Sequence, residues 1–297
     1  MSNSVFYLIQ FLNGLSLGMN LFIVAAGLTL ILGVLRILNF AHGVFYMLGG
    51  YIAYSVAAAL DFKGGFWIAT LAAGAALAVL ALVIERTLLR RLYDRDQTHQ
   101  LLFTFALVLL IGDFVKVIWG TDFLSISFPP GLDGATNLGI VYYPSYRLFL
   151  CVVGFLVALV LWYAINRTKW GRIIRAATQD REMLTALGVN VGLVYAAVFM
   201  IGSALAGIGG ALAAPSIALY PAMHAEIIVE SFIIVIIGGL GNLWGALLGA
   251  IILGQLTVFG TFLVPEFELV LIYLMMVLVL MFRPWGLLGR PEAGSSR

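Results

Sequence analysis

Long stretches without charged side chains constrain the fold of this chain more than any other feature. Residues 1–35, 189–223 and 231–265 contain no Lys, Arg, Asp or Glu. About 20 apolar helical residues cross the hydrocarbon core of a bilayer, so each stretch can hold at least one span. Backbone amides in lipid must be hydrogen-bonded within the protein, and the stretches lack the alternating pattern of barrel strands. The sequence therefore predicts membrane-spanning helices.

The composition agrees with this interpretation and disfavours several classes of function. Of the 297 residues, 63% are hydrophobic and 10% are charged, whereas a soluble domain has about 25% charged residues. We therefore expect neither a soluble enzyme, nor a disordered protein, nor a nucleic-acid-binding protein. The net charge of +2 suggests no polyanionic partner. The single cysteine, Cys151, excludes an intrachain disulfide and a multi-cysteine metal site.

The spacing of the apolar stretches predicts an all-α, polytopic helical bundle that forms a single transmembrane domain, residues 1–297. We expect about eight to nine transmembrane helices, some of them broken or re-entrant. Nine is the preferred number, and re-entrant pieces would reduce it to seven or eight. The expected spans lie within residues 1–35, 37–60, 64–84, 101–120, 148–166, 189–223, 227–237, 246–264 and 269–282.

The basic residues predict the orientation of the bundle. Most of the 16 Lys and Arg residues lie in segments that can share one side of the membrane, which leaves Lys63, Lys116 and Arg147 on the other. Loops rich in Lys and Arg face the cytoplasm. We therefore predict an external N-terminus and a cytoplasmic C-terminus, which requires an odd number of crossings.

Two polar, glycine-containing interruptions lie within the apolar stretches. They are residues 36–45, RILNFAHGVF, and residues 238–245, GGLGNLWG. Transporters use broken helices of this kind beside their substrate, but each interruption could instead be a tight turn between antiparallel spans. Arg36 favours a turn at the first, and we expect a partly buried break at the second. Small residues at helical spacing, Gly202, Ala206 and Gly210, predict close helix packing.

Three sets of polar residues are functional candidates. We interpret His42 as a structural hydrogen-bonding residue at the first break, because no other histidine is near it in sequence to complete a metal site. Asp113 and Lys116 are three residues apart and can neutralise each other, as a structural anchor near the outer loop. Glu226 and Glu230 share one face of a helix start, where they serve solvation or line a vestibule.

The longest polar stretch on the predicted cytoplasmic side lies between about residues 167 and 190. We expect Thr178 to cap a short helix, Asp180 to lie in its first turn, and Gly188 to end it. Met183, Leu184 and Leu187 would give this helix an apolar face. That face docks either against a peripheral partner subunit or against the ends of the protein's own helices.

The sequence lacks the motifs of nucleotide hydrolysis and of common hydrolytic chemistry. It contains no phosphate loop of the form G-x-x-x-x-G-K-[ST], no H-E-x-x-H and no G-x-S-x-G. If the protein moves a solute uphill, we expect the energy to come from another polypeptide or from an ion gradient.

Four segments resemble one family of membrane proteins. They are GLTLILGVLRILNFAHGVFYMLGGY (27–51), GRIIRAATQDREMLTALGVNV (171–191), IIGGLGNLWGALLGAIILG (236–254) and RPWGLLGRPE (283–292). In this order they are similar to signatures of the permease subunits of branched-chain amino-acid ABC importers, the LivH-like family. The resemblance covers nearly the whole chain.

The resemblance implies roles for two groups of residues. Residues that line the translocation pathway or break its helices would be Asn39, His42, Gly43, Gly238, Gly239, Gly241 and Asn242. Residues of the loop that couples the permease to an ATPase would be Arg175, Ala176, Ala177, Asp180, Arg181, Glu182 and Gly188. Gly188 follows the alanine pair at a longer spacing than in the general importer pattern, and is taken as the equivalent position.

The resemblance also implies a function and a set of partners. The chain would be a multi-pass subunit in the bacterial inner membrane, forming half of a pathway for branched-chain or other hydrophobic amino acids or related small solutes. Its partners would be a second homologous permease, two cytoplasmic ATPase subunits that use the ATP, and an external substrate-binding protein. The chain would be no enzyme and would need no cofactor. Because the family also includes importers of urea, short amides and aromatic acids, the motifs do not specify the substrate.

One alternative from a different class stays open. A self-sufficient ion-coupled carrier or channel would explain the polar breaks and the Asp113–Lys116 pair, although buried acids for ion coupling are scarce. A membrane-embedded enzyme is disfavoured because the chain has few clustered nucleophiles or metal ligands.

Overall fold

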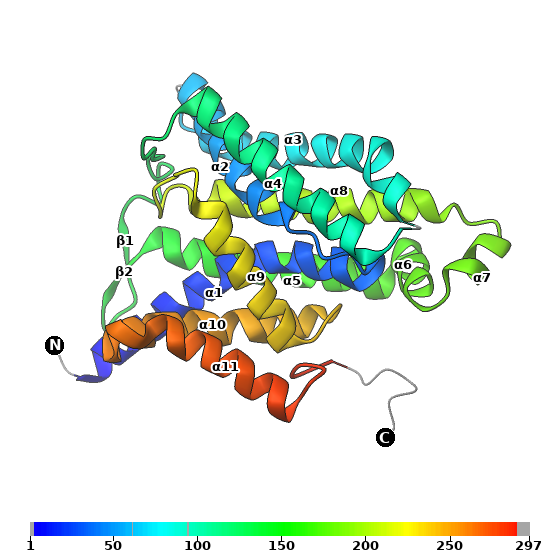
Figure 1. Cartoon of the computed structure of the whole chain (residues 1–297). Coiled ribbons are helices and arrows are strands. Elements are labelled where there is room, and N and C mark those ends of the chain that lie inside the picture. Colours follow the sequence, from blue (N-terminus) through cyan, green and yellow to red (C-terminus); the bar gives the residue numbers. More distant parts are fainter. Residues whose placement is uncertain (1–2, 61, 94, 290–297) are drawn as a thin grey trace.

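The computed structural model describes residues 3–60, 62–93 and 95–289, with the exception of the Arg181 side chain. Within this part of the chain the protein is an elongated bundle of helices (Figure 1). The start of α1 and a small β-hairpin lie at one end of the bundle, and two short helices, α6 and α7, lie at the other. The predicted all-α bundle is confirmed.

Nine helices of the described residues run along the bundle. They are α1 (Asn3–Leu35), α2 (Ala41–Ala59), α3 (Gly65–Thr87), α4 (Gln97–Trp119), α5 (Ser145–Arg167), α8 (Val191–Ala213), α9 (Met223–Gly238), α10 (Leu243–Leu263) and α11 (Glu268–Phe282). The shorter elements are η1 (Leu89–Leu92), α6 (Lys169–Gln179), α7 (Arg181–Ala186), η2 (Pro265–Phe267), β1 (Ala135–Asn137) and β2 (Tyr142–Pro144). The two strands pair antiparallel, with Ala135 opposite Pro144.

Seven of these segments are long and apolar enough to cross a membrane: α1, α3, α4, α5, α8, α10 and the segment Pro265–Phe282. The other two long helices, α2 and α9, lie in the interior and pack against each other and against α8 or α10. The number of crossings therefore stays a prediction, as does the orientation of the termini.

The core of the bundle lies around α1. In its most apolar window, 78% of the residues are buried, and α1 packs against α5, α8, α9 and α10. In the segment Pro265–Phe282, which includes α11, the corresponding share is only 11%. The outer helices expose large apolar side chains such as Val117 on α4 and Phe282 on α11. Exposed apolar surface of this extent is unstable in water and suits lipid or a neighbouring subunit.

Glycines allow the inner helices to approach closely. A Cβ atom on Gly49 of α2 would lie 2.4 Å from the Cα of Gly207 on α8, and one on Gly210 would lie 1.9 Å from the carbonyl oxygen of Tyr46. Contacts this short leave no room for any side chain, so α2 and α8 meet backbone to backbone. The predicted small-residue surface on α8 is confirmed as a packing surface.

Candidate functional site

The first helix break is an extended return of the chain into the bundle. Helix α1 ends at Leu35, Arg36 takes a left-handed φ of 57°, and α2 begins only at Ala41. The Nε2 atom of His42 lies 2.9 Å from the carbonyl oxygen of Val24. Val24 is eleven residues before Leu35, a rise of about 16 Å along a helix. A tight turn would have placed the start of α2 beside the end of α1, so that alternative is wrong.

This return buries polar groups that lack partners. Asn39 and His42 are both 0% exposed. No described residue hydrogen-bonds to the side-chain amide of Asn39 or to Nδ1 of His42. Buried polar atoms without a partner are rare in folded proteins and call for an explanation. The expected structural hydrogen bond of His42 is confirmed, but it uses only one of the two ring nitrogens.

Four helices meet at the start of α2. A Cβ atom on Gly43 would lie 2.4 Å from the carbonyl oxygen of His224, so the first turn of α2 touches the first turn of α9. A Cβ atom on Gly27 of α1 would lie 3.1 Å from the His42 ring and 2.4 Å from the carbonyl oxygen of Gly202 on α8. The predicted site residues Asn39, His42 and Gly43 therefore lie where α1, α2, α8 and α9 converge.

The second break joins α9 to α10 through a short loop whose backbone requires glycine. Gly239 and Gly241 have φ values of +102° and +74°, which side chains other than glycine rarely adopt. The Oδ1 atom of Asn242 accepts a hydrogen bond from the backbone N–H of Gly245 at 3.0 Å and so caps α10. A Cβ atom on Gly238 would lie 2.3 Å from the carbonyl carbon of Gly245. The last turn of α9 is therefore in contact with the first turn of α10.

The segment after α11 covers this second break. The backbone N–H of Leu287 donates to the carbonyl oxygen of Ile237 at 2.7 Å, and that of Leu288 donates to Gly238 at 3.1 Å. The side-chain amide of Asn242 in turn donates to the carbonyl oxygen of Leu288. Two motifs that the sequence analysis treated separately, GGLG and RPWGLLG, thus form one structural unit.

The two breaks lie at different depths along α1. Gly241 of the second break contacts Gly33, close to the end of α1, whereas His42 of the first break lies beside Val24. The structure therefore does not bring the seven predicted pathway residues into one cluster. The first set lies inside the bundle, and the second set lies near the end that carries α6 and α7 (Figure 1).

The predicted coupling residues lie on two short helices and the turns beside them. Arg175, Ala176 and Ala177 belong to α6, Asp180 separates the helices, Arg181 and Glu182 begin α7, and Gly188 follows it. The expected capping by Thr178 is wrong, because Thr178 lies within α6 and its hydroxyl donates to the carbonyl oxygen of Arg175. Asp180 itself is the cap of α7, with Oδ1 2.9 Å from the backbone N of Met183.

The end of α7 was predicted correctly, because Gly188 has a left-handed φ of +80°. Only part of the apolar face of α7 packs against the bundle, and the rest is exposed. Leu184 is buried, whereas Met183 and Leu187 are 63% and 72% exposed. The Arg36 guanidinium donates to the carbonyl oxygen of Thr178, which fixes α6 to the end of α1. The α6–α7 segment therefore packs on the bundle and still presents apolar side chains outward.

Sequence analysis missed a cavity beside α7. It has a volume of about 480 Å³ and lies between η1, α7 and the start of α8, with the lining residues Arg90, Tyr93, Glu182, Thr185, Val191, Gly192 and Tyr195. Behind it, the Tyr93 hydroxyl donates to Oε1 of the fully buried Glu85 at 2.8 Å. Burial and the Glu85 carboxylate raise the pKa of Tyr93, so the hydroxyl keeps its proton. An acidic residue ending a long apolar helix was the available sequence signal.

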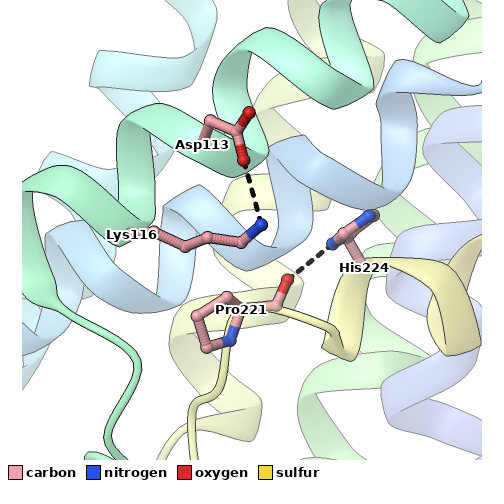
Figure 2. Close-up of polar contacts among 4 residues, drawn as sticks. All are labelled: Asp113, Lys116, Pro221 and His224. Atoms are coloured by element: carbon pink, nitrogen blue, oxygen red, sulfur yellow. Dashed lines mark hydrogen bonds and ion pairs between the residues drawn. The ribbon is translucent and has the colours of Figure 1, made fainter.

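The predicted pair on α4 is confirmed. Figure 2 shows Lys116 with its Nζ atom 2.9 Å from Oδ1 of Asp113. The same view shows Nδ1 of His224, at the start of α9, 2.7 Å from the carbonyl oxygen of Pro221. The lysine and aspartate side chains are 50% and 75% exposed, and exposed ion pairs contribute little to stability. This exposure shows that the pair is not a buried site, and its anchoring role stays a prediction.

The acidic residues of α9 lie close to two tyrosines. Glu226, in the first turn, lies near the hydroxyl of Tyr220, and Glu230 lies one turn further on near Tyr46. Burial, followed by the nearby Glu226 carboxylate, raises the pKa of Tyr220 to about 12. In the part of the chain that the structure describes, no group of three His, Cys, Asp or Glu residues could hold a metal ion.

These features define a multi-pass membrane protein with broken inner helices, and the comparisons with known proteins identify its family. The family model of the branched-chain amino acid transport system permease component matches residues 10–280, so the chain belongs to this family. The resemblance inferred from the four motifs is confirmed.

Three relatives illustrate the similarity. The permease protein BraD of Pseudomonas aeruginosa, from a high-affinity branched-chain amino acid transport system, is 31% identical over 96% of this chain and 97% of its own length. LivH of Escherichia coli K12 is 28% identical over 97% of both chains. LivM of the same strain is 27% identical over 91% of this chain and 68% of its own length. The solved structure of PsaBC from Streptococcus pneumoniae in complex with Fab is 14% identical over 90% of this chain and 89% of its own, with a TM-score of 0.46, a likeness too distant to bear on function.

Proposed function

We propose that this chain is a membrane-spanning permease subunit of an ATP-driven importer, and that it forms half of the pathway for branched-chain or other hydrophobic amino acids. The observation that carries the proposal is the family match over residues 10–280, which includes both helix breaks and the α6–α7 segment. The names of BraD and LivH place those relatives in branched-chain amino acid transport.

In this proposal the chain crosses the inner membrane nine times, with α2 and α9 as the two inner crossings. The N-terminus is external, and the end of the bundle with α6, α7 and residues 283–289 is cytoplasmic. The distribution of Lys and Arg supports this orientation, since Arg90, Arg172 and Arg175 gather at that end.

The ATPase subunits bind the α6–α7 segment. Two features support this assignment. Arg36 hydrogen-bonds α6 at the end of α1, and the exposed side chains of Met183 and Leu187 offer apolar surface to a partner. An ATPase that moved α7 would therefore act on α1, the most buried helix of the bundle. Asp180 and Gly188 hold the local geometry, as the cap and the stop of α7.

The pathway runs beside the start of α2. Asn39 and His42 supply buried polar atoms without partners, which is the kind of group that a passing polar solute can satisfy. Gly43 permits the close contact of α2 with α9 at the same level. The second break, with Gly238, Gly239, Gly241 and Asn242, acts as a fixed joint beneath it, because the segment after α11 covers it.

The remaining partners are a second, homologous permease and an external substrate-binding protein. The similarity of this chain to both LivH and LivM of one organism supports pairing with a related but different permease. The exposed apolar faces of α4, α5 and α11 offer surface for that partner and for lipid.

Reconstitution tests the proposal directly. Proteoliposomes that contain this chain, the second permease, the ATPases and the binding protein should take up radiolabelled leucine only when ATP is present on the ATPase side. Vesicles with this chain alone should show neither uptake nor ATP hydrolysis. Uptake by the chain alone, abolished by an uncoupler and independent of ATP, would overturn the proposal in favour of an ion-coupled carrier.

Labelling tests the orientation. A Met183→Cys variant in a Cys151→Ser background should react with a membrane-impermeant maleimide in inverted vesicles and not in intact cells. Labelling in intact cells would place α7 outside and reject the assignment of this segment to ATPase coupling.

A further inference from the structure

The cavity beside α7 has the chemistry of a small-molecule site. Its volume of about 480 Å³ lies within the range of about 300–1,000 Å³ that is typical of ligand pockets. Three segments form its wall: the connection between α3 and α4, helix α7, and the start of α8, which follows α7 closely in sequence. A ligand in this cavity would therefore touch all three.

One wall carries the cationic side chain of Arg90, which lies against the start of α8. The guanidinium of Arg90 packs so closely on Gly192 that a Cβ atom there would lie 2.7 Å from one of its nitrogens. The buried side chain of Glu85 lies behind and accepts a hydrogen bond from the Tyr93 hydroxyl at 2.8 Å. Planar guanidinium groups bind carboxylates through two parallel hydrogen bonds.

Glu182 supplies an anion to the same cavity. Among the described residues no salt bridge joins Glu182 to Arg90, although both line the space. The two opposite charges are therefore both available to a ligand that carries the complementary pair. Between them, Tyr93, Tyr195 and Val191 present aromatic and aliphatic surface. The rings of Tyr93 and Tyr195 meet edge to face at 5.3 Å, which gives this surface a fixed shape.

We propose that this cavity binds a free amino acid with an apolar side chain. The carboxylate of the ligand pairs with Arg90, its ammonium group pairs with Glu182, and its side chain lies against Tyr195 and Val191. A phosphate or nucleotide fits the cavity less well, because it would meet the carboxylate of Glu182.

The position of the cavity suggests what the ligand does. Occupancy links α7 to the α3–α4 connection through the ligand, and α7 is the helix that we assign to ATPase contact. This part of the inference rests on the proposed function, in which the cavity faces the cytoplasm and so samples the imported pool. Accumulated product would then hold α7 against the bundle and slow further import.

Direct binding tests the site without requiring transport. The complex of the two permeases and the ATPases, without the substrate-binding protein and free of nucleotide, is placed in nanodiscs. It is titrated with L-leucine, with 3-methylbutylamine, which lacks the carboxylate, and with 4-methylpentanoate, which lacks the ammonium group. We expect L-leucine to bind at least about tenfold more tightly than either analogue, since each analogue leaves one charge of the cavity unpaired.

Variants assign the binding to this cavity. Arg90→Gln should weaken leucine binding about tenfold or more. Gly192→Ala keeps the charge but displaces the guanidinium, and should also weaken binding. Arg86→Gln, at an exposed arginine at the end of α3 that does not line the cavity, should leave binding unchanged. Leucine binding that is identical in Arg90→Gln and in the unmodified complex would overturn the proposal.

A transport measurement tests the regulatory part separately. Vesicles preloaded with unlabelled leucine on the ATPase side should hydrolyse ATP several-fold more slowly than empty vesicles, and Arg90→Gln should remove this inhibition without changing the rate in empty vesicles. If leucine binds at Arg90 but the complex imports no amino acid, the site stands and the proposed function fails. If import proceeds and Arg90→Gln changes neither binding nor inhibition, the proposed function stands and the site fails.

Discussion

The side-chain amide of Asn242 donates a hydrogen bond to the carbonyl oxygen of Leu288, which is 46 residues further along the chain. The Oδ1 atom of the same side chain accepts a hydrogen bond from the backbone N–H of Gly245 and so caps α10. One side chain thus closes the second helix break and fastens the segment after α11 over it. This arrangement leads to the first prediction.

Asn242→Ala should release the segment after α11. The substitution removes both hydrogen bonds, and the loss of the cap alone costs about 1 kcal/mol. Chymotrypsin should then cleave after Trp285 faster than in the unmodified protein, as measured by mass spectrometry of timed digests. Asn242→Asp keeps the capping oxygen but has no N–H to donate, so it should release the segment while α10 stays capped.

Asn166→Ala is a matched control for this measurement. The Asn166 amide donates only within its own helix, to the carbonyl oxygen of Trp162. Chymotryptic cleavage after Trp285 should not change. Equal cleavage in the Asn242→Ala variant and the unmodified protein would mean that the amide does not hold the segment.

Substitutions at Asp180 separate capping from charge. Asp180→Ala removes the acceptor for the Met183 N–H and should destabilise α7 by about 1 kcal/mol, which is about fivefold in ATPase association. Asp180→Asn keeps a capping oxygen without the charge and should bind nearly normally. Asp180→Lys should insert into the membrane and lose association. Binding to immobilised ATPase is measured for all three variants. If Asp180→Asn loses as much binding as Asp180→Ala, the role of Asp180 belongs to its charge and not to capping.

Gly188 should be required for its backbone conformation and not for space. Nothing lies within 4 Å of a Cβ atom at this position, but its φ is +80°. A left-handed conformation costs most residues about 1–2 kcal/mol, and asparagine tolerates it better. ATP-dependent uptake should therefore fall in the order Gly, Asn, Ala, Val. Equal uptake in all four would show that the turn after α7 plays no part in coupling.

The buried carboxylate of Glu85 predicts an effect on stability. It is 0% exposed, and Tyr93→Phe removes the hydroxyl that donates to it. A buried acceptor left without its partner costs about 1–3 kcal/mol. The unfolding temperature of the purified protein should therefore drop in Tyr93→Phe and stay constant in Tyr163→Phe, whose ring is 61% exposed on α5. An unchanged unfolding temperature in both would contradict the structural role of the Tyr93–Glu85 pair.

The sequence was sufficient to predict the helices and their approximate limits. Apolar length and charge spacing act locally, so the expected spans within residues 64–84 and 148–166 correspond to α3 and α5 within a few residues. The ion pair of Asp113 with Lys116 follows in the same way, because residues three apart on a helix are neighbours.

The depth of the first break could not be predicted from local pattern. It depends on the contact of His42 with Val24, and on the glycine contacts that draw α2 toward α8 and α9. The cavity was missed for a similar reason. Arg90, Glu182 and Tyr195 belong to three segments, and each alone looks like an ordinary loop or helix-end residue. Thr178 was mistaken for a cap because α6 extends further than its polar sequence suggests.

The contact of α2 with α9 can be tested with two alanine substitutions that face the same residue. In Gly43→Ala the new Cβ atom would lie 2.4 Å from the carbonyl oxygen of His224, whereas in Gly112→Ala the nearest atom is the His224 ring carbon at 3.9 Å. Both substitutions favour helix formation by about 1 kcal/mol, so the difference between them isolates the contact. Gly43→Ala should force α2 and α9 apart, at a cost of about 1–3 kcal/mol, and abolish uptake. Gly112→Ala should keep a normal yield of folded protein by size-exclusion chromatography and normal uptake. If Gly43→Ala transports as well as Gly112→Ala, the close approach of α2 and α9 is not needed for the pathway.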